Sequence, residues 1–271
     1  MSYREYEESN YSGAPRILYE FRLGSNRWRY TNAQTTINVS GAIYRSISIS
    51  HDEIAMSGEP NGESLTIQIA PGSEVARLFI GTPPSDTLSV VIRAQHRGDP
   101  DAVIIWSGIV KSGKRTSAAE FEIICNSLMS TLNRNGLRLS WGRSCPFALY
   151  DRSCKVVPSD YSVTGQVASM GGSVVRSNAF AAFPDGYFSG GFVAFVGEYG
   201  TTERRAVERH VGNTLTFMGN TDGISVGNMV TAYPGCDRIT STCQSKFNNL
   251  ANYGGFPHLP NKSPFDGDPV F

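Results

Sequence analysis

The chain has 271 residues, enough to bury a substantial hydrophobic core as one large domain or two ordinary ones. Charged residues make up only 18% of it, with 24 basic residues against 24 acidic ones; about 25% is usual. This neutral balance excludes recruitment of nucleic acid or anionic membrane by net charge. It fits a subunit that buries much of its surface in an assembly.

The N-terminal stretch MSYREYEESNYSGAP has no apolar segment behind a basic region, so we expect no secretory signal and synthesis in the cytoplasm. The longest apolar runs, residues 102–106 and 192–196, are far too short to span a membrane, which predicts no membrane anchor. Residues 1–12 are polar and rich in tyrosine. They predict a flexible N-terminal arm that is able to order on a partner, with a disordered chain end as the alternative.

Strand-like patterns dominate residues 13–140, which are predicted to form a first β-barrel domain. Apolar residues alternate with polar ones from Ile17, and turn segments such as SGEPNGES and HRGDPD separate the later strands. Short helices are expected at residues 73–80 and 127–133, and Cys125 in the run FEIIC is expected to fill the core. Further strands are expected at residues 36–39, 42–50, 64–70, 87–95, 102–110 and 118–125.

A second β domain is predicted for residues 141–233, and a C-terminal segment follows at residues 234–271. That segment should hold a short helix at 241–250 and an extended tail rich in proline and glycine. A short helix is also expected at residues 147–151. The fold class is therefore mainly β, with two barrel-like units, few short helices and second-unit strands at 161–168, 173–176, 191–196, 204–211, 213–218 and 228–233.

Four cysteines form two pairs that bracket the second β domain: Cys145 with Cys154, and Cys236 with Cys243. Two distant pairs suggest one shared site. In a reducing cytosol such thiols favour a metal or cluster over the alternatives, a disulfide or unpaired core thiols. Thr240 or Ser241 is a good helix N-cap, which would place Cys243 in a first turn that favours the metal-binding thiolate.

The spacings of the two pairs are Cys-x8-Cys and Cys-x6-Cys, wider than the usual Cys-x2–4-Cys knuckles of zinc sites. A four-iron cluster spreads its cysteine ligands over a larger cube. The spacing therefore favours an iron–sulfur cluster, with zinc as the alternative.

Catalytic patterns are weaker. The string Gly223-Ile224-Ser225-Val226-Gly227 matches a nucleophile elbow but lacks the strand before it and the helix after it. The histidines are scattered without a metalloenzyme spacing. The basic string at Arg204 and Arg205 is interpreted as a solvated strand face, not a nucleic-acid patch.

Several motifs resemble the C-terminal signature of tail-tip hub proteins from long-tailed, non-contractile phages and gene transfer agents. They are Gly235-Cys236-Asp237, Cys243 followed by KFNN at 246–249, and NYGGFPHLP at 252–260. Cys145 and Cys154 are similar to that family's upstream pair. An arginine is common in the family where Gly255 stands, which implies a different local loop here. The N-terminal half is similar only in its β-rich character and length.

The resemblance implies a β-barrel hub that forms a homotrimer at the tail end and joins the distal tail protein to the central fibre or receptor-binding tip protein. It implies a channel for the tape-measure protein and for transient DNA passage without specific binding. It also implies that Cys145, Cys154, Cys236 and Cys243 bind a 4Fe-4S cluster, whereas Cys125 has no counterpart.

We therefore expect a non-enzymatic virion protein of the tail tip or baseplate, assembled in the host cytoplasm, with the cluster as a structural clasp. Two other functions stay open. One is a tail-associated cell-wall hydrolase that uses Cys145 or Cys154 with His210 as base. The other is a zinc-stabilised β module that binds nucleic acid.

Overall fold

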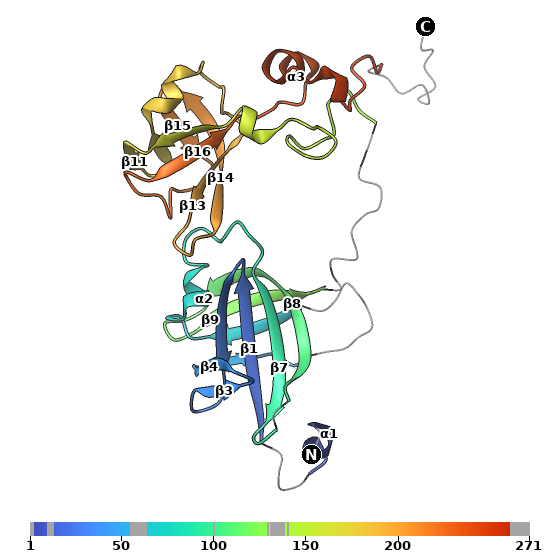
Figure 1. The fold of residues 1–271 in the computed structure, drawn as a ribbon, viewed down its shortest axis with the longest axis vertical. Helices are drawn as coiled ribbons and strands as arrows, with labels where there is room; N and C mark the ends of the chain where they lie inside the picture. The colour runs from blue at the N-terminus through green and yellow to red at the C-terminus, as the bar shows by residue number, and fades with distance from the viewer. Residues whose placement is uncertain are drawn as a thin grey trace. The chain divides into compact units, whose positions relative to one another are not determined.

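The computed structural model describes residues 3–9, 14–54, 64–99, 101–128, 130, 139 and 141–260 (Figure 1). The described part is mainly β with few short helices, as the sequence predicts. Contacts divide the chain into two compact units, one of residues 1–134 with 198–201 and one of residues 135–197 with 202–271. Among the described residues, no helix has the length and apolarity needed to cross a membrane.

The first unit is built on a nine-stranded sheet with the order β3-β4-β2-β1-β7-β8-β9-β6-β5. Most neighbouring strands are antiparallel, and β2 with β4 is a parallel pair. The strands are β1 (Pro15–Leu23), β2 (Asn26–Thr31), β3 (Ile37–Val39), β4 (Ala42–Ser46), β5 (Ile49–His51), β6 (Ser64–Ile69), β7 (Ser89–His96), β8 (Val103–Arg115) and β9 (Phe121–Ser127).

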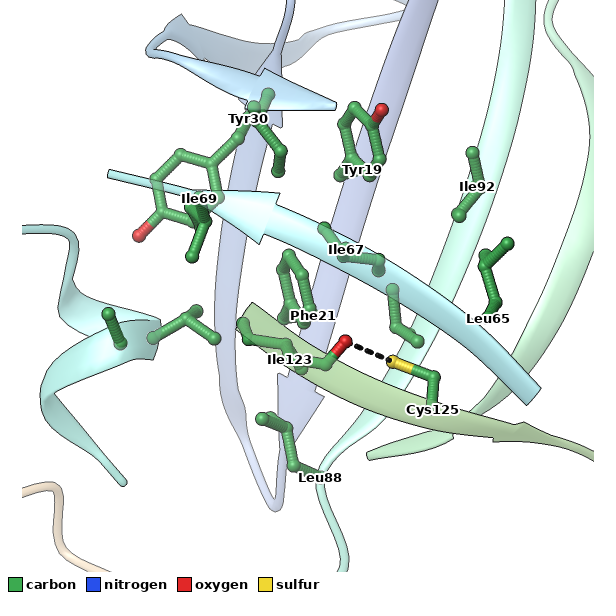
Figure 2. Close-up of a cluster of buried hydrophobic side chains, with 14 of the residues drawn as sticks. Tyr19, Phe21, Tyr30, Leu65, Ile67, Ile69, Leu88, Ile92, Ile123 and Cys125 are labelled. Atoms are coloured by element: carbon green, nitrogen blue, oxygen red, sulfur yellow. Dashed lines mark hydrogen bonds between the residues drawn. The ribbon is translucent and has the colours of Figure 1, made fainter. Parts of the chain in front are cut away.

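The core of this unit is made by alternate residues of its strands, since successive side chains point to opposite faces of a sheet (Figure 2). Tyr19 and Phe21 of β1 are fully buried there. Cys125 lies in the same cluster, with its Sγ 4.0 Å from the carbonyl oxygen of Ile123. Burial raises the pKa of the Cys125 thiol to about 12. The prediction that this cysteine fills the core is confirmed.

Several first-unit boundaries differ from the predicted ones. The strand at residues 26–31 was not predicted, although its arginines and aromatic residues alternate with the period of a strand. The predicted strand at 42–50 is divided into β4 and β5. A short helix, α1 (Tyr3–Glu7), precedes the sheet and packs on β7, whereas α2 (Glu74–Arg77) lies inside the predicted helix at 73–80. The expected helix at 127–133 falls largely outside the described residues.

The second unit is built on a seven-stranded sheet with the order β10-β16-β13-β14-β15-β12-β11. Its long strand β14 pairs with β13 through its first half and with β15 through its second, with a register shift between Val207 and Arg209. The strands are β10 (Val163–Gln166), β11 (Ser169–Gly171), β12 (Val174–Arg176), β13 (Phe192–Val196), β14 (Thr202–Val211), β15 (Thr214–Phe217) and β16 (Met229–Tyr233).

Short helices and helical turns lie before, between and after the strands of this second sheet in the chain. Three are 3₁₀ turns: η2 (Pro158–Asp160), η3 (Asn178–Ala182) and η4 (Leu250–Asn252). The helix α3 (Thr240–Phe247) follows β16 and ends three residues before the predicted end. The helix expected at 147–151 is absent from this described stretch, which forms turns. Tyr150 has φ 70°, a left-handed conformation that a right-handed helix cannot contain.

Candidate functional site

A cavity of about 190 Å³ lies within the second unit, and all four cysteines of the predicted site line it. Cys145 and Cys154 come from the segment before the seven-stranded sheet, and Cys236 and Cys243 from the segment after it. Cys243 is buried, and the other three are partly exposed. The fold therefore brings together two pairs of thiols that are far apart in the sequence.

The first cysteine loop is held by one carboxylate and one tyrosine. Asp151 accepts hydrogen bonds from the backbone N–H groups of Ala148, Ser153 and Cys154, at 3.1, 2.8 and 2.6 Å. The hydroxyl of Tyr150 donates to the carbonyl oxygen of Pro234 at 2.9 Å. This second bond ties the first cysteine loop to the chain just before Cys236.

The second cysteine loop turns sharply at Arg238, which has φ 66°. This conformation lets the backbone N–H of Arg238 point at Cys236 Sγ, 3.3 Å away. The carbonyl oxygen of Arg238 in turn accepts a 3.0 Å hydrogen bond from the N–H of Cys145. A backbone hydrogen bond thus joins the two cysteine loops, and both loops line the same cavity.

Backbone conformations that are costly for non-glycine residues are concentrated around the cavity. Five such residues have positive φ in the described part of the chain, and four of them, Tyr150, Lys155, Arg238 and Asn248, lie in the cysteine loops or at the end of α3. Strain of this kind persists where surrounding structure overdetermines it, and it is often found at functional sites. The loops around this cavity therefore depend on contacts that hold these four residues in left-handed conformations.

Cys243 lies at the fourth position of α3, and the helix does not begin as predicted. The N-cap residue is Ile239, not Thr240 or Ser241. Asp237 replaces the expected cap, since its carboxylate accepts from the Ile239 N–H at 3.1 Å and the Thr242 hydroxyl at 2.7 Å. The backbone N–H of Cys243 already donates to the carbonyl oxygen of Ile239, so this N–H is not free to stabilise a thiolate.

The electrostatics of the thiols differ from the sequence expectation as well. Burial raises the pKa of Cys243 above the usual thiol value, and the neighbouring thiols Cys236, Cys145 and Cys154 raise it further. Burial also raises the pKa of Cys236, partly opposed by its bond from the Arg238 N–H. The thiols of Cys236 and Cys243 therefore favour their protonated form, and a positively charged group bound among them would favour the thiolates.

The C-terminal end of α3 reaches back to Cys154. Asn248 ends the helix in a left-handed conformation with φ 44°. The side-chain amide of Asn249 then donates to the carbonyl oxygen of Cys154 at 2.6 Å and lies 3.8 Å from its Sγ. Asn252 fixes the orientation of this amide by donating to Asn249 Oδ1 at 2.7 Å.

Residues 253–260 close one side of the site. The hydroxyl of Tyr253 lies 2.7 Å from the carbonyl oxygen of Arg143 and 3.1 Å from that of Arg238. The N–H of Phe256 donates to the Gly142 carbonyl oxygen at 2.8 Å. A Cβ at Gly255 would lie 2.5 Å from the Arg143 carbonyl oxygen, so this backbone approach requires glycine.

Asn249 and Tyr253 are site residues to which sequence reasoning assigned no role. Both stand inside the motifs KFNN and NYGGFPHLP. The available signal was their position in those motifs, since a lone asparagine or tyrosine carries no chemical signature of its own. Their hydrogen-bond partners, Cys154, Arg143 and Arg238, lie on other segments and become visible only in the fold.

The donor set and the cavity fit a group larger than one ion. Four sulfurs at about 2.3 Å from a zinc ion would close on it and leave no space between them, whereas these thiols surround a cavity. Within the described residues, no group of three or more His, Cys, Asp or Glu side chains is placed to hold a metal ion. A thiol-lined cavity suits an iron–sulfur cluster, which needs four cysteine sulfurs spread around it.

Other sequence candidates lie away from these thiols. His210 does not line the cavity, because its ring is buried against Phe188 and its Nε2 lies 2.8 Å from the Gly212 carbonyl oxygen. The structure therefore does not form the dyad that the hydrolase alternative requires. Ser225 stands between turns that lead into a strand, which differs from a nucleophile elbow.

Residues 18–157 match the family described as baseplate hub protein, N-terminal attachment domain, which is more than half of the chain. The chain belongs to this baseplate hub family. It is accordingly a structural component of a phage-type virion, as the resemblance implied. The match includes Cys145 and Cys154 and covers the N-terminal half, where sequence motifs showed only a general likeness.

Two further similarities involve phage and gene transfer agent proteins. Residues 186–263, which contain Cys236 and Cys243, match a family described as phage conserved hypothetical protein BR0599. A chain in the solved virion of a native gene transfer agent (GTA) particle has the same fold, with a TM-score of 0.81 and 19% identity. That similarity covers 99% of this chain and 96% of the other. No curated protein matches the chain.

Proposed function

We propose that this baseplate protein is the tail-tip hub, and that its four paired cysteines hold a 4Fe-4S cluster as a structural clasp. The observation that carries the cluster proposal is the cavity lined by Cys145, Cys154, Cys236 and Cys243. When bound, such a cluster supplies four iron–thiolate bonds. These bonds would join the entrance and the exit of the second unit, which also meet through hydrogen bonds and through ring contacts such as that of Trp141 with Phe256.

The protein's own residues prepare the site for this role. Asp151 and Arg238 orient Cys154 and Cys236 through backbone N–H groups, and Asn249 places an amide beside Cys154. Tyr253 spans the two loops. Because metal binding and folding are coupled, the bound state would gain the stability that these loops lack as irregular structure.

The proposed hub is a homotrimer whose role is assembly of the tail tip and not catalysis. Its barrel-like units would form a ring between the distal tail protein and the central fibre or receptor-binding tip protein. The ring would leave a central channel for the tape-measure protein and later for DNA. The balanced charge of the chain supports passage without specific binding, since no net positive field holds a polyanion.

The cluster is tested by purification without oxygen. We expect a brown protein with an absorbance band near about 400 nm and about four irons per chain. Cys236→Ser should be colourless and fold poorly, whereas Cys125→Ser should keep its iron, since Cys125 lies in the core of the other unit. A colourless wild-type protein with one zinc per chain would instead establish the zinc alternative.

The hub assignment is tested separately, by the mass of the purified chain and by complementation. Particles that lack this protein should be tailless or non-infectious, and wild-type protein should restore them. A monomer at all concentrations would remove the trimer from the proposal. Peptidoglycan cleavage that is lost in Cys145→Ser or Cys154→Ser would favour the hydrolase.

A further inference from the structure

The face of β2, β1 and β7 that points away from the core of the first unit carries a basic cluster. It holds four arginines, Arg22, Arg27, Arg29 and Arg93, against a single acidic residue, Glu20. The lysines and arginine at the end of β8 do not add to it, because Lys114 pairs with Glu122 of β9 and Arg115 lies opposite Phe121 of the core. Because the whole chain has no net charge, this excess is a local feature.

Glu20 lies at the centre of an arginine cluster on this face. Its side chain is 5% exposed and makes ion pairs with Arg22, Arg29 at 3.2 Å and Arg93 at 3.5 Å. Arg27 stands across from Arg22 in the strand register and is exposed. One carboxylate contacts three guanidinium groups, and Arg27 adds a fourth beside them, which leaves an excess of three positive charges.

The cluster is held in place before a partner arrives. All of its arginines stand on strands, and Glu20 fixes three of them. The side chains of Arg22, Arg29 and Arg93 remain 41%, 26% and 19% exposed, so part of each guanidinium group still faces outward. Fixing arginines in advance lowers the entropy lost on binding, and a guanidinium can bond a carboxylate through two parallel N–H groups.

Apolar side chains lie beside the arginines on the same sheet. Ile104 pairs with Arg93 across β7 and β8 and is 58% exposed. Val91 and Ile109 are half-buried on the neighbouring positions. Arginine together with exposed aliphatic residues is typical of protein–protein interfaces. A nucleic-acid phosphate backbone, in contrast, has no apolar surface that could cover an isoleucine side chain.

We propose that this face is a docking surface for an acidic surface of another virion protein, one that also carries apolar or aromatic side chains. Carboxylates would replace water on the arginine cluster, and an apolar side chain would cover Ile104. The face lies within residues 18–157, which match the attachment domain of the hub family. The inference deepens the proposed hub role by giving the chemistry of a partner, and it does not depend on the cysteine site.

The test measures binding of the full-length protein to three probes of equal length: polyglutamate, a random glutamate–tyrosine copolymer and duplex DNA. We expect the copolymer to bind most tightly, with an affinity that falls as salt is added. Arg27→Glu should weaken its binding about tenfold, because an exposed positive charge becomes a negative one. Ile104→Ser should remove the advantage of the copolymer over polyglutamate.

Arg77→Glu is the matched control, since Arg77 is an exposed arginine on α2 in the same unit. It should change binding less than twofold. Equal or tighter binding of DNA, an unchanged affinity in Arg27→Glu, or an equal loss in Arg77→Glu would each overturn the proposal. Iron content should be the same in all three variants, so failure here is distinct from failure of the cysteine site.

A second measurement uses assembled particles. Complementation with Arg27→Glu should lower the number of copies of this protein per particle about tenfold, while the free variant keeps its fold and its iron. Normal incorporation of the variant would show that attachment uses another face.

Discussion

The backbone N–H of Cys145 donates a 3.0 Å hydrogen bond to the carbonyl oxygen of Arg238, which joins the loop of the first cysteine pair to the loop of the second. Arg238 also points its own N–H at Cys236. One residue with a left-handed backbone therefore contacts both loops. The arrangement couples the positions of the two pairs even without a bound group.

Tyr253→Phe should weaken this coupling. The hydroxyl of Tyr253 reaches the carbonyl oxygens of Arg143 and Arg238, one on each loop. Losing one hydrogen bond should lower the free energy of unfolding of the second unit by about 1 kcal/mol. Urea unfolding followed by the fluorescence of the unit measures this. Tyr233→Phe, which keeps its ring stacked on Phe192, is the control and should cost less.

Gly255→Ala should displace the segment that closes the site. The added Cβ would lie 2.5 Å from the Arg143 carbonyl oxygen and 2.7 Å from the Ser144 carbonyl carbon, both of which are backbone atoms. The two backbone segments must then move apart, which should lower the free energy of unfolding by about 1–3 kcal/mol. Hydrogen exchange of the Phe256 amide, which bonds to Gly142, reports the opening directly.

The control for this substitution is Gly171→Ala. A Cβ at Gly171 meets nothing within 4 Å, and its φ is not positive. Its effect on stability should stay within about 0.5 kcal/mol. Equal exchange rates at Phe256 in wild type and Gly255→Ala would show that the closing segment has more room than its contacts indicate.

The strand pattern of both sheets was predictable because alternation of apolar residues is a local signal. Residues 64–69 and 192–196 illustrate this, since each lies inside a predicted strand. The strand at 26–31 was missed although it carries the same signal, since Arg27 and Arg29 alternate with Trp28 and Tyr30. The prediction that Arg205 lies on a solvated strand face is wrong, because its side chain is buried. Its guanidinium group lies 3.6 Å from the Glu203 carboxylate and over the ring of Phe195.

The sequence predicted that the four paired cysteines lie together, as they do around the cavity, but it did not predict the geometry of their loops. Pairing of cysteines within a sequence can indicate that Cys145 and Cys236 share a site, because thiols carry a chemical identity. The turn at Tyr150 is held by a hydrogen bond to Pro234, which is far away in the chain, so a tertiary contact overrode the local helix propensity there. The cap at Asp237 is local, since its partners are Ile239 and Thr242, and it was missed because Thr240 and Ser241 also carry cap-forming side chains.

Asn249→Asp should destabilise the site at Cys154. The substitution keeps the shape of the side chain but replaces the N–H donor by a negative charge beside the Cys154 carbonyl oxygen and Sγ. Under the proposed function, iron should be lost to a chelator at least about tenfold faster, since hydrogen bonds to ligand sulfurs tune and protect a cluster. Asn252→Asp, one bond further out, should have a smaller effect. Equal rates in both variants would mean that the amide of Asn249 has no specific role.

Glu20→Gln should destabilise the first unit in a pH-dependent way. Burial alone would raise the pKa of Glu20, but hydrogen bonds and charges from Arg22 and Arg29 outweigh it and hold the pKa below its ordinary value. The ionised carboxylate therefore stabilises the folded state above the unfolded pKa of about 4.3, and this contribution is lost as pH falls through the lower folded pKa. At pH 7 the variant should lose about 2 kcal/mol in free energy of unfolding.

The difference between wild type and Glu20→Gln should shrink as pH falls below about 4, because the unfolded carboxylate is protonated there, and the difference is lost as pH falls through the lower folded pKa. Urea unfolding at a series of pH values measures it. Glu122→Gln is the control, since Glu122 pairs with the exposed Lys114 at 2.9 Å and such pairs contribute about 0–1 kcal/mol. A Glu20→Gln deficit that stays constant from pH 7 to pH 3 would show that packing of the side chain, not its charge, holds the arginine cluster together.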